Sequence, residues 1–235
     1  LSKFVTKIAA GTEEAMKHFP ADKVVFTGNP IRSEVLSAQR EQGAAAFGLD
    51  PKKLTVLISG GSRGARAINL AIGVLKNAAP HPEVQFLHVT GKRGYQGVLD
   101  GLKQAGVDLA SCPQLLVKPY LYNMPQAMAV ADLAIFRAGA TGLAELTARG
   151  IPAILIPYPY AAENHQEHNA RALEEAGAAR MILDRDLTPE RLSSVLTELL
   201  SEPDKLRAMA KASRAMGRPQ AASDIADLVL AIAKK

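Results

Sequence analysis

The stretch RAGATGLAEL (137–146) holds residues that could recognise a phosphorylated, hydroxyl-rich ligand. Arg137 precedes a run of small residues, and Glu145 follows within the next expected helix. A guanidinium can pair with a diphosphate, and a carboxylate can accept two hydrogen bonds from a vicinal diol. Each residue also has a simpler explanation, namely a surface salt bridge for Arg137 and a solvated helix residue for Glu145. Spacing alone favours the simpler explanation for Glu145 and leaves Arg137 undecided.

A second candidate is the glycine-rich turn in SGGSRGAR (59–66). Backbone N–H groups at the start of a helix suit a phosphate, and Ser62 could add a hydroxyl donor. The turn is not a Walker A loop, because no Gly-Lys-Ser/Thr follows. It also fits a dinucleotide fingerprint poorly, since the next strand ends in LHVT without an acid for an adenosine ribose. The glycines could equally serve only to pack strand against helix.

A third cluster, AAENHQEHNA (161–170), offers His165, Gln166, His168 and Asn169. The two histidines are spaced to share a helix face, which would suit a metal. No cysteine or well-spaced acid completes such a site, so a metal is disfavoured. Amide and imidazole groups suit sugar hydroxyls better. The Asp-x-Asp pair in DRD (184–186) is also more consistent with a turn before the helix cap Thr188-Pro189 than with metal binding.

The elements that would position these residues alternate between strand and helix. Apolar runs without polar alternation are typical of strands buried on both faces of a parallel sheet, and each run is followed by a helical pattern. The pattern therefore predicts an α/β fold, a Rossmann-like parallel sheet with helices on both faces. The expected strands are 24–27, 54–59, 84–89, 114–117, 133–136, 153–156 and 180–183, and the expected helices are 1–10, 66–76, 95–105, 124–131, 141–148, 165–176 and 220–233.

Composition limits the classes of function. Apolar residues make up 48% and charged residues 22% of the 235 positions, as in ordinary globular proteins. A net charge of +5 weakly favours anionic ligands or an anionic membrane surface. The basic residues are scattered and aromatics are few, which argues against nucleic acid. The single cysteine, Cys112, excludes an internal disulfide and is expected to be buried. No signal peptide or spanning run is evident, and the start at Leu1 suggests a piece of a longer protein.

Several motifs together resemble the MurG family, the bacterial UDP-N-acetylglucosamine:lipid-linked muramyl-pentapeptide N-acetylglucosaminyltransferases of peptidoglycan synthesis. The resemblance covers essentially the whole chain. The matching stretches are TGNPIR (27–32), GGSRGAR (60–66), PYLYNM (119–124), RAGATGLAEL (137–146) and NHQEHNARALEEAGAA (164–179).

This resemblance implies the GT-B fold, in which two Rossmann-like domains face a cleft. It implies that residues 1–32 are the end of an N-terminal acceptor domain and a linker. Residues 33–217 would form the UDP-sugar donor-binding domain, and 218–235 a C-terminal helix. The acceptor-side loops and the catalytic base would lie outside this chain, so no catalytic residue can be named.

The resemblance also implies roles for individual residues. Ser62 would hold the diphosphate, with Arg32 and Arg137 as phosphate-side charges. Leu121 would offer its backbone to uracil, and Glu145 would bind the ribose hydroxyls. The remaining expected contacts are Tyr120 and Met124 around the base, Ala140 and Thr141 at a helix start facing the donor, His165 and Gln166 on the N-acetylglucosamine hydroxyls, and Asn169 behind them.

The activity implied is inverting, metal-independent transfer of N-acetylglucosamine from UDP-N-acetylglucosamine to lipid-linked N-acetylmuramyl-pentapeptide, without a cofactor. The expected location is peripheral, at the cytoplasmic face of the bacterial plasma membrane. The chain alone is expected to be inactive. Two alternatives stay open: another GT-B UDP-sugar glycosyltransferase, or a non-catalytic nucleotide-binding module.

Overall fold

The computed structural model describes residues 4–61, 64–71 and 83–233, and its centre is a six-stranded sheet. The strands coincide with the apolar runs of the sequence, and most of their residues are buried. They are β3 (Leu54–Ser59), β4 (Val84–Val89), β5 (Leu115–Lys118), β6 (Leu133–Phe136), β7 (Ala153–Leu155) and β8 (Ala179–Met181). The predicted strand 180–183 is therefore displaced, because Ala179 rather than Leu183 pairs with β7.

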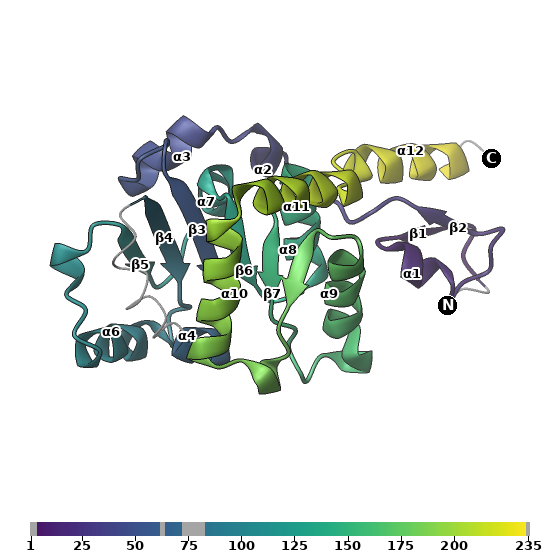
Figure 1. Cartoon of the computed structure of the whole chain (residues 1–235). Helices are drawn as coiled ribbons and strands as arrows, with labels where there is room; N and C mark the ends of the chain where they lie inside the picture. Colours follow the sequence, from purple (N-terminus) through teal and green to yellow (C-terminus); the bar gives the residue numbers. More distant parts are fainter. Residues whose placement is uncertain (1–3, 62–63, 72–82, 234–235) are drawn as a thin grey trace.

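The order of the strands, β5-β4-β3-β6-β7-β8, locates the site region. All neighbouring pairs are parallel. From β3 the chain builds outward through β4 to β5, then returns to place β6 on the other side of β3. The register pairs Ser59 with Phe136, so the turns that follow β3 and β6 start side by side. Figure 1 shows the strand arrows running toward the same lower edge of the sheet. Ligands of open α/β sheets bind at such reversal points.

Helices cover both faces of the sheet, which confirms the predicted fold class. Along β3, Val56 and Ile58 belong to one apolar cluster, while Leu57 between them belongs to the other. The first face is covered by α4 (Arg66–Ala71), α6 (Tyr95–Gln104) and α10 (Pro189–Ser201), and the second by α7 (Met124–Val130), α8 (Ala140–Arg149) and α9 (His165–Glu175). α11 (Pro203–Met216) contributes residues to both clusters and crosses the top of the view in Figure 1.

The start of α10 and the end of α8 are fixed by local capping residues. Thr188 caps α10 by accepting a hydrogen bond from the backbone N–H of Arg191, with Pro189 in the first turn, as predicted. α8 ends at Gly150, which adopts a left-handed conformation (φ 71°). A Cβ at Gly150 would approach the Arg214 side chain of α11 to 2.8 Å, so the position needs glycine for packing as well as for conformation.

A small unit precedes the sheet domain and corrects one prediction. The helix expected over 1–10 is wrong for the residues that the structure describes, since β1 (Ile8–Ala10) pairs in parallel with β2 (Val24–Phe26). The amphipathic pattern gave way because backbone bonds such as Ile8 N–H to Lys23 O extend the segment into a strand. The short helix α1 (Glu13–Met16) connects the two strands, and α12 (Ala221–Ala233) extends beside this unit in Figure 1.

The linker from the small unit carries two helices that the sequence did not predict, α2 (Ser33–Ser37) and α3 (Arg40–Phe47). Arg40 fixes α3 to the amino-terminal edge of the sheet. Its guanidinium donates to both carboxylate oxygens of Asp132, at 3.0 and 2.9 Å, and to three backbone carbonyls. Asp132 in turn accepts from the backbone N–H of Thr55 on β3. Among the described residues, no helix has the length and apolarity that crossing a membrane requires.

Candidate functional site

The turn after β3 has glycines for two different reasons. A Cβ at Gly60 would lie 2.3 Å from Ala65, and one at Gly64 would lie 2.2 Å from the Thr90 carbonyl oxygen, so both positions are required by packing. Gly61 has a left-handed φ of 85°, and no described atom lies within 4 Å of the site of its Cβ. Packing thus explains only part of the glycine-rich turn. Ser62, the predicted diphosphate contact, lies outside the described residues.

A buried polar network holds the strand next to this turn. His88 on β4 has no exposed surface, and its Nε2 lies 3.1 Å from Oδ1 of Asn69 on α4. The amide nitrogen of Asn69 donates to the Thr90 carbonyl, so its oxygen faces His88 and the imidazole must carry its proton on Nε2. Burial lowers the pKa of His88 to about 3, which keeps the ring neutral. The network ties α4 to the end of β4.

The turn after β6 opens onto the start of α8, as predicted. Gly139 precedes the helix with φ −74°, a conformation that any residue adopts, and no described atom lies within 4 Å of the site of its Cβ. Neither conformation nor crowding within the described chain requires glycine there. Ala140 and Thr141 follow, and both are exposed. The helix N-terminus therefore presents its backbone N–H groups to open space beside Gly139.

Glu145 is buried rather than solvated, which excludes the simpler explanation from the sequence. Only 6% of the residue is exposed. Its Oε1 accepts two hydrogen bonds from Arg32, from Nε at 3.2 Å and from a terminal nitrogen at 2.9 Å. The Arg32 side chain is 53% exposed. The linker and the sheet domain thus meet at this ion pair, and one of the two predicted phosphate-side arginines is placed next to the predicted ribose ligand.

Arg137 is held by protein groups on the same edge. It forms an ion pair with Asp184 and donates to the carbonyls of Ile156, at 3.2 Å, and Pro157, at 2.9 Å. Its side chain is only 13% exposed. The DRD segment forms a 3-10 turn (Asp184–Asp186), in agreement with the turn role favoured by the sequence. The guanidinium is therefore fixed between the ends of β6, β7 and β8.

The connection from β7 to α9 contains two residues in an uncommon conformation. Glu163 (φ 51°) and Asn164 (φ 53°) are the only non-glycine residues with positive φ in the described ranges. Such residues persist where their surroundings fix them. Asn164 donates to Glu167 at 2.8 Å, and this bond, together with Arg171, lowers the pKa of Glu167. The sequence carried no glycine to signal this turn.

The predicted sugar contacts emerge from this turn on the first turns of α9. His165 is exposed, and its Nδ1 lies 2.8 Å from the Ala162 carbonyl oxygen. Gln166 Oε1 accepts a hydrogen bond from the backbone N–H of Tyr158 at 3.0 Å, so the amide NH₂ of Gln166 points away from that N–H. Asn169 donates to the Ala138 carbonyl at 3.1 Å, which ties α9 to the turn after β6.

The predicted base pocket lies at the end of β5, away from these groups. Leu121 and Met124 are half-buried against the core. Tyr120 is 38% exposed, and the Lys92 ammonium lies 5.5 Å from its ring centre. Cys112, expected to be buried, is half-buried against the other core cluster.

The structure thus gathers most predicted residues along one edge of the sheet. Tyr120 lies at the β5 end of this edge, and the two glycine turns follow at the reversal point. The buried Glu145 carboxylate with its Arg32 partner comes next, and the amides of Gln166 and Asn169 lie at the β7 end. Sequence reasoning missed two residues that contact Arg137. One is its ion-pair partner Asp184, and the other is Tyr158, whose ring centre lies 5.6 Å from the guanidinium. The signal for Tyr158 was its position shortly after an apolar strand. No group of His, Cys, Asp or Glu suited to a metal is found within the described ranges.

Comparison with known proteins identifies the family. The model of the glycosyltransferase family 28 C-terminal domain matches residues 55–227. The chain is 48% identical to the UDP-N-acetylglucosamine--N-acetylmuramyl-(pentapeptide) pyrophosphoryl-undecaprenol N-acetylglucosamine transferase of Halothermothrix orenii, covering 100% of this chain and 64% of the relative. The protein of the same name from Desulforamulus reducens is 47% identical over 96% of this chain and 61% of its own length. The chain spans less than two thirds of these relatives.

Solved structures share the fold of this chain. Acinetobacter baumannii MurG superimposes with a TM-score of 0.74 at 28% identity, over 97% of this chain and 62% of that one. A UDP-GlcNAc 2-epimerase from Neisseria meningitidis, solved bound to UDP-GlcNAc, shares the fold with a TM-score of 0.67 at 17% identity, over 97% of this chain and 62% of that one. The match over residues 55–227 shows that the chain belongs to the glycosyltransferase family 28 C-terminal domain family.

Proposed function

We propose that this chain is the donor-binding part of an N-acetylglucosaminyltransferase and that its ligand is UDP-N-acetylglucosamine. The observation that carries the proposal is that no described atom lies within 4 Å of a Cβ built at Gly61 or Gly139, in the two turns that start side by side at the reversal point of the sheet. A diphosphate seated there would meet the N-terminus of α8 and its unpaired N–H groups. The names of the curated relatives support the sugar and the nucleotide.

The remaining groups divide the ligand between the two ends of the edge. Glu145, already desolvated and held by Arg32, would accept the two ribose hydroxyls. Leu121, Tyr120 and Met124 would surround uracil at β5. His165 and Gln166 would meet the hydroxyls of N-acetylglucosamine at β7, with Asn169 setting the distance of α9 from the turn that carries Ala140 and Thr141.

In the longer protein, the acceptor would be lipid-linked N-acetylmuramyl-pentapeptide. Its 4-hydroxyl would attack C1 of the sugar and displace UDP with inversion. This chain would stabilise the charge that develops on the leaving diphosphate, a role that preorganised N–H donors and a fixed guanidinium such as Arg137 can fill. The proposed setting is the cytoplasmic face of the bacterial plasma membrane, reached peripherally, and the proposed division into 1–32, 33–217 and 218–235 follows the two sheets and α12.

Titration calorimetry of the purified chain against UDP-N-acetylglucosamine, UDP and NAD tests the proposal. We expect the two uridine ligands to bind and NAD not to bind. A radiolabelled transfer assay with the same chain should show no product, because the chain spans less than two thirds of its relatives and the acceptor contacts are proposed to lie outside it. Preference for NAD would overturn the proposal, and turnover by the chain alone would overturn the assignment of the chemistry to the missing part.

A further inference from the structure

Tyrosines stand out among the aromatic residues of this chain by their position. Four of its five tyrosines are exposed, namely Tyr120, Tyr122, Tyr158 and Tyr160. All four follow the carboxyl ends of β5 and β7. Within each strand end the two rings meet edge to face, with centroids 5.0 Å apart after β5 and 5.6 Å apart after β7. Sequence reasoning gave a role only to Tyr120, so the pair after β7 needs an explanation.

The backbone under the Tyr158–Tyr160 pair is fixed. The N–H of Tyr158 donates to Gln166 Oε1 at 3.0 Å, which ties the pair to the first turn of α9. The Arg137 guanidinium lies over the Tyr158 ring, 5.6 Å from its centre. Arg137 is itself nearly buried and held by Asp184 and two carbonyls. The segment therefore holds two aromatic rings, 44% and 83% exposed, on a constrained support.

The hydrogen bond to Tyr158 also orients Gln166. A backbone N–H can be satisfied only by the amide oxygen, so the NH₂ of Gln166 must point away from the tyrosines' backbone and is presented as a donor. The same bond thus couples an amide donor to an aromatic surface. A pyranose offers the matching chemistry, since it has a face of C–H groups and a rim of hydroxyl oxygens, while a tyrosine combines an apolar ring with a polar tip.

The spacing of the two tyrosine pairs fits the length of a nucleotide-sugar. The order β5-β4-β3-β6-β7 puts four inter-strand steps between them, about 19 Å. The open turns beside Gly61 and Gly139 lie at the middle of this span, after β3 and β6. A ligand with its diphosphate at the middle and its base at β5 would bring its sugar to β7.

We propose that Tyr158 and Tyr160 form an aromatic wall for the sugar ring of the nucleotide-sugar, with Tyr160 as the outer, sugar-contacting ring and Tyr158 as its support. The inference rests on the proposed function and adds to it Tyr160 as a specificity-determining residue and Tyr158 as the residue that positions it. It predicts that the pair contributes to recognition of the sugar and not of the nucleotide.

The test measures the dissociation constants of UDP and UDP-N-acetylglucosamine by calorimetry on the wild-type chain, Tyr160→Ala, Tyr160→Phe and Tyr122→Ala. Tyr122→Ala is a matched control, because Tyr122 is 86% exposed and also packs edge to face on the tyrosine two positions before it. We expect Tyr160→Ala to weaken UDP-N-acetylglucosamine about threefold to tenfold relative to UDP, consistent with the loss of one aromatic contact. Tyr160→Phe should keep most of the preference, and Tyr122→Ala should leave the ratio unchanged.

The outcomes separate the two levels of inference. If the wild-type chain binds neither ligand, the proposed function fails and the aromatic wall with it. If both ligands bind and Tyr160→Ala leaves their ratio at the wild-type value, the wall is overturned while the proposed function stands. An equal loss of both ligands in Tyr160→Ala would also overturn the wall, because the ring would then support the nucleotide or the fold. Circular dichroism of each variant checks that the chain is folded.

Discussion

The guanidinium of Arg32 lies 2.9 Å from the carboxylate of Glu145, 113 positions further along the chain. Arg32 is half-exposed on the linker, whereas Glu145 is buried on α8. A buried carboxylate without a partner is costly, so Arg32 offsets the burial of Glu145 and fixes the position of its carboxylate.

Replacing Glu145 tests its proposed role with the ribose. Glu145→Ala should weaken UDP binding about tenfold to a hundredfold, because losing one charge-assisted pairing costs about 1–3 kcal/mol. Calorimetry with UDP and with UDP that lacks its ribose hydroxyls completes a double-mutant cycle. The wild-type chain should discriminate strongly between the two ligands, and the variant should bind both almost equally. A variant that keeps the full preference for the diol would show that Glu145 serves only the fold.

Removing the partner tests the ion pair itself. Arg32→Ala should lower the free energy of unfolding by about 1–2 kcal/mol, since it leaves Glu145 unpaired but lets water reach it. Urea unfolding followed by circular dichroism measures the change. In the Glu145→Gln background the same Arg32→Ala substitution should cost much less, because a neutral amide does not need a counter-charge. Equal costs in both backgrounds would contradict an interaction between the two side chains.

The charge on the ligand should matter for binding at the reversal point of the sheet. UDP should bind the chain more than about tenfold more tightly than uridine, since each charge-assisted hydrogen bond to the diphosphate contributes about 1.5–3 kcal/mol. Competition calorimetry with the two ligands measures the ratio. The advantage of UDP should shrink as salt is raised, because screening weakens the exposed part of the interaction. Equal affinities would mean that the turns after β3 and β6 are purely structural.

His88 should make stability depend on pH below neutrality. The pKa of His88 is about 3 in the folded chain, whereas the ordinary pKa of a solvent-exposed histidine is 6.5. The unfolded chain therefore binds the proton more readily than the folded chain. The stability that the neutral ring contributes is full above pH 6.5 and is lost as the pH falls toward 3. Between pH 7 and pH 5 the loss from this one group should be about 2 kcal/mol.

The control for this pH effect is His88→Gln, which cannot titrate. Urea unfolding of both chains across pH 5–7 cancels the carboxylates that they share. The stability advantage of the wild-type chain over the variant should shrink by about 2 kcal/mol as the pH falls. A difference that stays constant would show that His88 is protonated as easily in the folded chain as in the unfolded one.

The Arg40–Asp132 pair predicts a loss of stability without a loss of affinity. Arg40→Ala removes five hydrogen bonds at the amino-terminal edge of the sheet and should cost about 2–4 kcal/mol in urea unfolding. Arg40→Lys should recover little of this stability, because a lysine ammonium cannot donate to both carboxylate oxygens of Asp132 in the way that the planar guanidinium does. UDP affinity below the unfolding transition should remain at the wild-type value, since the proposed site is at the opposite edge. A large loss of affinity in a folded variant would contradict this separation.

Much of the fold could be predicted from the sequence because the main strands are buried on both faces. LTVLIS and VQFLHV have no polar alternation, and both are central strands. The segment before Ala10 failed because its three-residue strand depends on pairing with residues 24–26, a contact that local periodicity does not encode. α2 and α3 failed for a related reason, since short helices draw their stability from tertiary packing.

The candidate site was predictable in its glycine turns and in the polar start of α9, where residue type and position agree. Its pairings were not predictable. From the sequence alone Glu145 is expected to be a solvated helix residue, because nothing in the local spacing shows that Arg32 of the linker contacts it. The left-handed Glu163 and Asn164 carry no glycine signal, and the Asp184 partner of Arg137 lies two strands away in the sheet order. These relationships arise from the arrangement of separate elements and not from local spacing.

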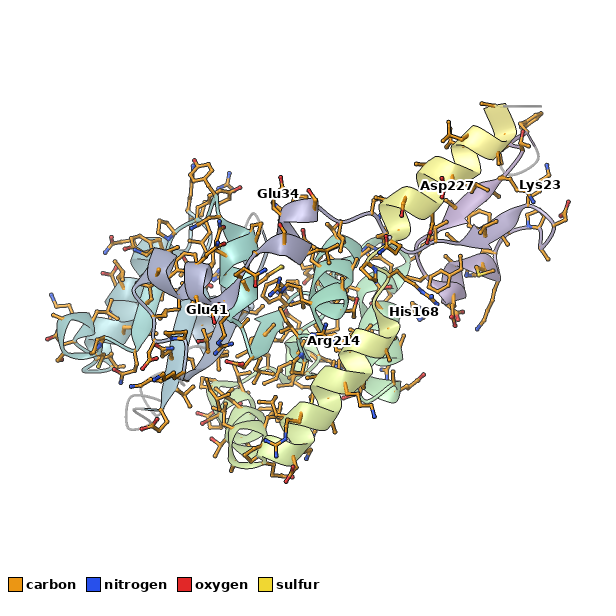
Figure 2. All side chains as sticks on the ribbon, turned by 90° about the horizontal axis from the view of Figure 1, so that it is seen from above. Lys23, Glu34, Glu41, His168, Arg214 and Asp227 are labelled. Carbon is orange, nitrogen blue, oxygen red and sulfur yellow. The ribbon has the colours of Figure 1, made fainter. Side chains whose placement is uncertain are left out.

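The contact between Gly28 and Arg218 has a mechanical consequence. The chain passes between the small β1–β2 unit and the sheet domain twice, near 27–32 and near 217–220, and the crossings touch where a Cβ at Gly28 would meet Arg218 at 2.6 Å. Arg218 also lies over the Phe26 ring, 4.5 Å from its centre. A side chain at position 28 would therefore press on the second crossing, and the left-handed φ of 79° adds to the requirement for glycine there. Figure 2 shows His168 of α9 lying beside the small unit.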